Sequence, residues 1–227
     1  DNPEELLSIS LGSAETTLLN LTSAYSSFVN GGKLISPIII DRIQDSEGNT
    51  IINNENRKCI NCDKISYTGK DYPQIEDNYE QVMSEQTAYQ VTTILEGVIK
   101  RGTGKKLRNL QLNLAGKTGT TNENTDAWFI GFTSNLVIGV YVGMDNPKPL
   151  GKFETGSKAA LPIFREFIEK SVKKSDARPF KVPKKMTLMV VDPLTGEKAK
   201  FNSKNTIIEA YKSKNVLNGK VLYSDNN

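Results

Sequence analysis

The residues best suited to chemistry lie in one short stretch, Lys-Thr-Gly-Thr at positions 117–120. An apolar segment, residues 112–115, precedes it, and an aromatic segment around Trp128 follows it. A lysine is costly to bury unless an anion or a strongly polar group meets it. The side chain of Lys117 therefore either faces solvent at a plain turn or is placed to meet a negative charge.

Strand alternation divides these residues between two faces. Lys117 and Gly119 share one face, and Thr118 and Thr120 share the other. Twist, and a substrate that lies along the strand edge, can bring both threonines near a carboxylate. Gly119 lacks the side chain that would hold a peptide away from the backbone. We therefore expect an extended peptide to bind here as an added strand.

The chain contains no histidine, which excludes Ser-His-Asp and Cys-His nucleophilic systems and His-ligated zinc. A nucleophile would need a lysine, a carboxylate or an amine as its base. Two cysteines, Cys59 and Cys62, lie in a polar stretch and cannot supply the four ligands of a closed zinc site. We expect a local disulfide or two idle thiols on a surface loop, in preference to metal or redox chemistry.

Composition indicates a globular chain. The 227 residues are 37% hydrophobic and 24% charged, enough for one good core and a small second unit. The net charge of +3 does not indicate a nucleic-acid partner. The sequence shows neither an apolar run of membrane-spanning length nor a signal-peptide pattern. We expect membrane association only through an N-terminal segment absent from this sequence.

Helical periodicity and end signals predict three helices within residues 12–32, 84–104 and 157–174. Thr16 or Thr17 is the predicted N-cap of the first helix, and Ser84 that of the second. Three strand-like runs with short turns lie between the second and third helices, at residues 112–121, 126–133 and 135–144. Consecutive strands with helices at both ends predict an α+β fold, in which helices flank an antiparallel sheet.

The remaining segments are expected to be smaller units. Residues 36–52 predict two strands joined by a turn, and residues 53–80 a long loop or insertion. Residues 173–185 predict a basic linker. A hairpin around residues 193–196 and a short helix at residues 205–213 complete the expected elements. We place a boundary between a main unit, 1–175, and a linker with a small C-terminal extension, 176–227.

Lys117-Thr118-Gly119 matches the K-T-G element of penicillin-binding proteins and serine β-lactamases. The stretch "GKTGTTNENTDAWFIGFTSNLVIGVYVGMDNPKPLGKFETGSKAALPIF" resembles the class A (bifunctional) penicillin-binding proteins almost throughout. The resemblance spans roughly residues 5–172, with residues 53–80 its least typical part, and the tail is similar to the family's C-terminal extension. It implies the serine β-lactamase/D,D-peptidase fold, incomplete at its N-terminal side.

The resemblance also implies roles for the motif. Lys117 would act in catalysis beside the serine and the lysine of two other motifs. Thr118 and Thr120 would hydrogen-bond the terminal carboxylate of a peptidoglycan stem peptide ending in D-Ala-D-Ala, with Gly119 lining the same site. The N–H of Thr120 would form half of an oxyanion hole. The family's reaction needs no metal or cofactor, and β-lactams are its covalent inhibitors.

Literal matches to the other two motifs of the family occur in the wrong order. Ser171 fits S-x-x-K, and three serines fit S-x-N, namely Ser203, Ser213 and Ser224. All four follow Lys117, whereas the family places both motifs before K-T-G, and such short patterns recur by chance. We therefore expect the nucleophilic serine to lie upstream of this chain, which alone would be unable to acylate.

The resemblance implies part of a peptidoglycan D,D-transpeptidase that acts at the outer face of the bacterial cytoplasmic membrane. Two alternatives stay open: a β-lactamase or β-lactam sensor, and a non-catalytic structural or interaction fragment.

Several other residues that match the family have less definite roles. The Arg-Gly-Thr-Gly of residues 101–104 is either a feature of the cleft rim or a helix-ending turn. Asp126 either braces a turn or touches substrate, and residues 154–156 have no assignable role. Trp128 and Phe129 are expected in the core.

Overall fold

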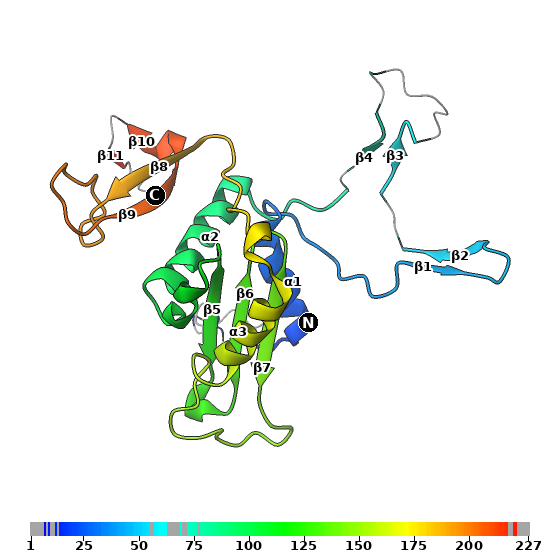
Figure 1. Ribbon diagram of the computed structural model, residues 1–227, viewed down its shortest axis with the longest axis horizontal. Coiled ribbons are helices and arrows are strands. Elements are labelled where there is room, and N and C mark those ends of the chain that lie inside the picture. Colours follow the sequence, from blue (N-terminus) through cyan, green and yellow to red (C-terminus); the bar gives the residue numbers. More distant parts are fainter. Residues whose placement is uncertain are drawn as a thin grey trace.

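A three-stranded antiparallel sheet lies at the centre of the computed structural model, which describes residues 7, 9, 12, 14–54, 57–62, 69, 72–76, 78–217 and 220–221. Its strands lie in the order β5-β6-β7, with bounds β5 Ala115–Thr120, β6 Ala127–Phe132 and β7 Val137–Val142. Each pair of neighbours runs antiparallel through six matched positions. The predicted antiparallel sheet is confirmed (Figure 1).

Three helices flank the sheet, as the sequence predicts. They are α1 (Leu18–Val29), α2 (Glu85–Lys100) and α3 (Ala160–Ser171). Thr17 caps α1 by accepting from the N–H of Asn20, and Ser84 caps α2 by accepting from the N–H of Thr87. These contacts satisfy amide groups that have no partner inside the helix, and so fix where each helix begins.

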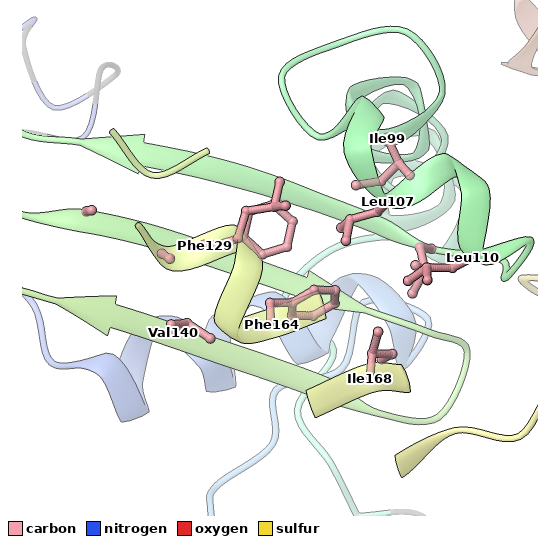
Figure 2. Close-up of a cluster of buried hydrophobic side chains, with 11 residues drawn as sticks. Ile99, Leu107, Leu110, Phe129, Val140, Phe164 and Ile168 are labelled. Carbon is pink, nitrogen blue, oxygen red and sulfur yellow. The ribbon is translucent and has the colours of Figure 1, made fainter. Parts of the chain in front are cut away.

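One face of the sheet packs on α3 and forms the main core (Figure 2). The rings of Phe129 in β6 and Phe164 in α3 lie 4.8 Å apart at their centroids, and both side chains are fully buried. Three residues from the end of α2 and the turn after it close the cluster: Ile99, Leu107 and Leu110. Burial of these apolar side chains holds the sheet, α3 and the end of α2 together.

The opposite face is covered only in part. Leu95 of α2 packs with Ala115 and Phe132 of the sheet, and α1 adds Tyr25 and Phe28 to this second cluster. Farther along the same face, Lys117 and Tyr141 are exposed. This face is therefore packed at one end and open at the end that carries Lys117.

Two small hairpins project from the main body (Figure 1). The first pairs β1 (Arg42–Gln44) with β2 (Thr50–Asn53), and its turn confirms the predicted strand pair. The second pairs β3 (Cys59–Ile60) with β4 (Gln74–Ile75). This hairpin lies inside residues 53–80, so the prediction of a long loop there is corrected to a segment that contains two short paired strands. A disulfide joins Cys59 to Cys62 beside this hairpin and decides between the two expectations for these cysteines.

The C-terminal extension is a hairpin of β8 (Met186–Val191) and β9 (Ile207–Lys212), followed by the short strands β10 (Val216–Leu217) and β11 (Lys220–Val221). The helix predicted at residues 205–213 is wrong, because this segment pairs with β8 along the whole of β9. Residues 192–196 do form the expected turn. Directly after this turn the chain contacts the end of β8 through a Val191–Lys198 bridge and a hydrogen bond from the N–H of Ala199 to the carbonyl of Val190 at 2.9 Å.

The extension packs on α2. The side chain of Gln90 in α2 donates to the carbonyl of Ala210 at 3.0 Å, and Arg101 forms an ion pair with Glu209 at 3.0 Å. Short 3-10 turns connect the elements: η2 (Lys105–Leu110), η3 (Asn122–Asn124), η4 (Lys174–Asp176) and η5 (Ser213–Asn215). Leu95 of α2 packs on Ala115 of β5, so α2 contacts both the K-T-G strand and the C-terminal hairpin.

Candidate active site

The K-T-G residues occupy β5, which is an edge strand in the part of the chain that the structure describes. Lys117 is exposed, and its Nζ donates to the carbonyl of Thr118 at 2.7 Å. The ammonium group therefore lies along its own strand, where it is accessible to an anion. Of the two possibilities for this lysine, burial in the core is excluded, because its side chain stays in solvent within β5.

Gly119 lies opposite Trp128 of β6 in the sheet register. A Cβ at Gly156 would come within 2.5 Å of the Gly119 carbonyl oxygen and would also collide with the Trp128 carbonyl oxygen. The backbone groups of Gly119 thus lie on the β6 side of the strand. The N–H and C=O groups of Thr118 and Thr120, one residue away in each direction, consequently point to the free edge.

Trp128 lies beneath Gly119 on the open face of the sheet. Its ring packs against Tyr141 with a centroid distance of 4.7 Å, and its side chain is only half-buried. A Cβ at Gly119 would lie 3.1 Å from the Cβ of Trp128. Phe129 is a core residue as expected, but the expectation for Trp128 is wrong because register turns it to the face that the helices leave open.

Both threonine hydroxyls of β5 are held by residues from other segments. Thr118 Oγ1 lies 3.0 Å from Thr103 Oγ1, which belongs to the turn after α2. Thr120 Oγ1 accepts a 3.0 Å hydrogen bond from the N–H of Gly156. A hydroxyl that accepts from a backbone amide still has its own hydrogen to donate. The side chain of Thr120 is therefore oriented and remains a donor.

The glycines of the Arg-Gly-Thr-Gly turn allow it to fold tightly against the end of α2. The N–H groups of Gly102 and Gly104 both donate to the carbonyl of Val98, at 3.1 Å and 3.0 Å. A Cβ at Gly102 would lie 2.9 Å from the Val98 Cα, and one at Gly104 would lie 2.7 Å from the Ile99 Cδ1. The two glycines thus let the turn place Thr103 against β5. The helix-ending turn is confirmed, and a role at the rim of a cleft stays a prediction.

Asp126 braces the turn that follows the motif. Its Oδ1 accepts from the Tyr141 hydroxyl at 2.6 Å, and its Oδ2 accepts from the hydroxyls of Thr121 and Thr125 at 3.2 Å and 3.1 Å. The hydrogen bond from Tyr141 holds the pKa of the Asp126 carboxyl below its ordinary value, and the same bond raises the pKa of the Tyr141 phenol. Of the two roles considered for Asp126, the structure supports the brace.

A family model for the penicillin binding protein transpeptidase domain matches residues 3–169, about three quarters of the chain. The chain belongs to the penicillin-binding protein transpeptidase family. It is 42% identical to penicillin-binding protein 1A of Rickettsia prowazekii over 219 residues, which are 95% of this chain and 27% of that relative. It is 36% identical to penicillin-binding protein 1A of Neisseria flavescens over 179 residues, 78% of this chain and 20% of that relative.

The fold agrees with the sequence match. The crystal structure of penicillin-binding protein 1A from Haemophilus influenzae superposes with a TM-score of 0.73 at 29% identity, covering 91% of this chain and 33% of that one. The resemblance to penicillin-binding proteins and the transpeptidase fold are thereby confirmed. This member of the family spans about a quarter of the length of the curated relatives that it matches most extensively.

The serines that fit the other family motifs lie elsewhere in the chain. Ser171 is the exposed last residue of α3, which covers the face of the sheet opposite Lys117. Ser203 follows β8, and Ser213 begins η5. Ser224 lies outside the described residues. The structure thus brings residues 117–120 together on one edge and places the described S-x-x-K and S-x-N matches on other elements.

The described residues contain no group of three or more His, Cys, Asp or Glu side chains able to hold a metal ion. Within the same ranges, every helix falls short of the length and hydropathy needed to cross a bilayer.

Proposed function

We propose that this chain forms the K-T-G wall of the active site in a peptidoglycan D,D-transpeptidase. The observation that carries the proposal is the free edge of β5, where the Lys117 ammonium, the Thr120 N–H and two positioned hydroxyls lie within four consecutive residues. A donor peptide added along this edge would pair with the outward N–H and C=O groups of Thr118 and Thr120.

The reaction is acyl transfer. A serine Oγ attacks the carbonyl of the penultimate D-Ala, the terminal D-Ala leaves as an amine, and an acyl-serine ester forms. An amine of a second stem peptide then attacks the ester and releases the serine. Lys117 supports proton transfer and the anionic substrate, while the N–H of Thr120 stabilises the developing oxyanion.

The carboxylate of the donor peptide would be met by Thr118 and Thr120. Hydrogen bonds to an ionised acceptor are stronger than those between neutral groups, so two positioned hydroxyls favour a free carboxylate over an uncharged end. β-Lactams carry a carboxylate beside their reactive amide and are the expected covalent inhibitors. The reaction as proposed requires no metal or cofactor.

The serine nucleophile is proposed to lie outside this chain, in the remainder of the full-length protein. Ser171, which fits S-x-x-K, is exposed on the far side of the sheet from Lys117. The chain also covers only 27% of a relative such as penicillin-binding protein 1A of Rickettsia prowazekii, which leaves room for the serine elsewhere in the full-length protein. The Cys59–Cys62 disulfide favours an oxidising compartment, which agrees with a site at the outer face of the cytoplasmic membrane.

The test is release of D-Ala by the full-length protein from a donor peptide ending in D-Ala-D-Ala. We expect Lys117→Ala to abolish release, and Lys204→Ala to leave it unchanged because Lys204 is an exposed lysine in the C-terminal extension. Release by Lys117→Ala at the wild-type rate would overturn the role of Lys117. Turnover of β-lactams without D-Ala release would instead support the β-lactamase alternative.

A further inference from the structure

Two threonine hydroxyls meet at the rim of the proposed site. Thr103 Oγ1 and Thr118 Oγ1 lie 3.0 Å apart, although the residues are fifteen positions apart in sequence. Thr103 is exposed and Thr118 is half-buried. Each hydroxyl has a single hydrogen, so within this pair one group donates and the other keeps its hydrogen for a third partner.

The direction of this bond decides what Thr118 can do. When Thr103 donates to Thr118 Oγ1, the hydrogen of Thr118 is available to a ligand at the strand edge. When Thr118 donates to Thr103, its hydrogen is used and an anion beside it meets only oxygen lone pairs. An anionic acceptor at Thr118 selects the first arrangement, because a donor toward the anion is favoured and a lone pair is repelled.

We infer that Thr103 is a positioning residue for substrate selection. Its hydroxyl donates to Thr118 Oγ1, so that the Thr118 hydroxyl donates its own hydrogen to the carboxylate of the donor peptide. This inference rests on the proposed function and deepens it. It assigns to the Arg-Gly-Thr-Gly turn a part in distinguishing a free carboxylate from an esterified or amidated end.

The surrounding structure holds Thr103 where this role requires it. Gly102 and Gly104 pack against the end of α2 with no room for a Cβ, so the turn has little freedom to move. The neighbouring cation, Arg101, is engaged by Glu209 of the C-terminal extension at 3.0 Å. A neutral hydroxyl, and not the guanidinium, is thus the group that contacts Thr118.

The effect should depend on the charge of the ligand. Charge-assisted hydrogen bonds are about twice as strong as neutral ones, so orienting Thr118 matters most for a carboxylate. Benzylpenicillin and its methyl ester share one reactive ring and differ in this charge. A structural defect at residue 103 would slow acylation by both compounds, whereas loss of the positioning bond would slow chiefly the acid.

The experiment measures second-order acylation rates of the full-length protein with the two compounds. Thr103→Val removes the hydroxyl at nearly constant shape, and Thr103→Ser retains it. Thr93→Val is the matched control, because the Thr93 hydroxyl donates to the carbonyl of Gln90 at 2.8 Å within α2. For Thr103→Val we expect a roughly tenfold slower reaction with the acid and a change within about twofold for the ester. Thr103→Ser and Thr93→Val should behave as wild type.

Two results would overturn the inference while leaving the proposed function in place: equal slowing of both compounds by Thr103→Val, or no slowing of either. A wild-type protein that neither compound acylates would overturn the proposed function itself, and this inference with it. Thermal unfolding of each variant, measured alongside, shows whether the fold is retained.

Discussion

The N–H of Gly156 donates to Thr120 Oγ1 at 3.0 Å, and the backbone of Gly156 packs directly on that of Gly119. The loop between β7 and α3 therefore contacts the K-T-G strand directly, although Gly156 and Thr120 are thirty-six residues apart in sequence. This contact gives a role to Gly156, for which sequence alone offers none. The missing Cβ is required because its position is already occupied by two carbonyl oxygens.

Gly156→Ala should displace the end of β5. Its Cβ would collide with backbone atoms of Gly119 and Trp128, which cannot rotate away as a flexible side chain could. We expect acylation of the full-length protein by benzylpenicillin to fall by at least about tenfold, as misplacement of a site by an ångström costs that much or more. Lys158→Ala, an exposed change in the same loop, is the control. Equal rates in the two variants would contradict the role of Gly156.

Asp126→Asn should loosen the turn after the motif. The carboxylate accepts three side-chain hydrogen bonds, and the amide cannot accept all three with the same strength. We expect amide hydrogen exchange in peptides covering residues 121–126 to become roughly fivefold faster, which corresponds to about 1 kcal/mol of local opening free energy. Unchanged exchange there would show that the carboxylate does not brace the turn.

The contribution of the Tyr141–Asp126 hydrogen bond to folding stability should depend on pH. The folded pKa of Asp126 is below its unfolded value near 4, so this contribution to stability is present above about pH 4 and is lost as pH falls further. The folded pKa of Tyr141 is raised, so its contribution is present below about pH 10 and is lost as pH rises through the folded pKa.

Tyr141→Phe tests this pH dependence, because it removes the donor that lowers the Asp126 pKa. Titration of the Asp126 carboxyl carbon by NMR should show its pKa rising toward the ordinary value in the variant. Identical titration curves for wild type and variant would mean that another group lowers the Asp126 pKa.

The disulfide hairpin should be dispensable for acylation. Cys59 and Cys62 lie in the projecting β3–β4 unit, away from the β5 edge (Figure 1). We expect a Cys59→Ser/Cys62→Ser variant of the full-length protein to be acylated by benzylpenicillin within about twofold of the wild-type rate, the scatter expected of a distant substitution. A large loss of acylation would tie this hairpin to the site.

Sequence predicted the elements whose signals are local. The N-caps at Thr17 and Ser84 and the three short-turn strands follow from neighbouring residues, and the structure confirms them. Residues 207–212 show the limit of this approach. They were expected to be helical, but Ile207, Ile208 and Tyr211 favour a strand once β8 is available to pair with them.

The site was predictable only along β5 itself. The alternation of Lys117 and Gly119 with Thr118 and Thr120 between the two faces of a strand follows from their sequence. Their roles in binding and catalysis stay predictions. The contacts that orient them come from Thr103 and Gly156, at separations of fifteen and thirty-six residues. Such contacts depend on how α2 and the loop before α3 pack on the sheet, which no local pattern encodes.

The proposed role of Lys117 beside a serine from outside this chain is tested by peptide mapping of the full-length protein after reaction with benzylpenicillin, in wild type and in Lys117→Ala. We expect one adduct, on a serine outside residues 1–227, and acylation of Lys117→Ala slower by roughly a hundredfold or more, as expected for loss of a proton-transfer group. An adduct on Ser171, or labelling of Lys117→Ala at the wild-type rate, would contradict this proposal.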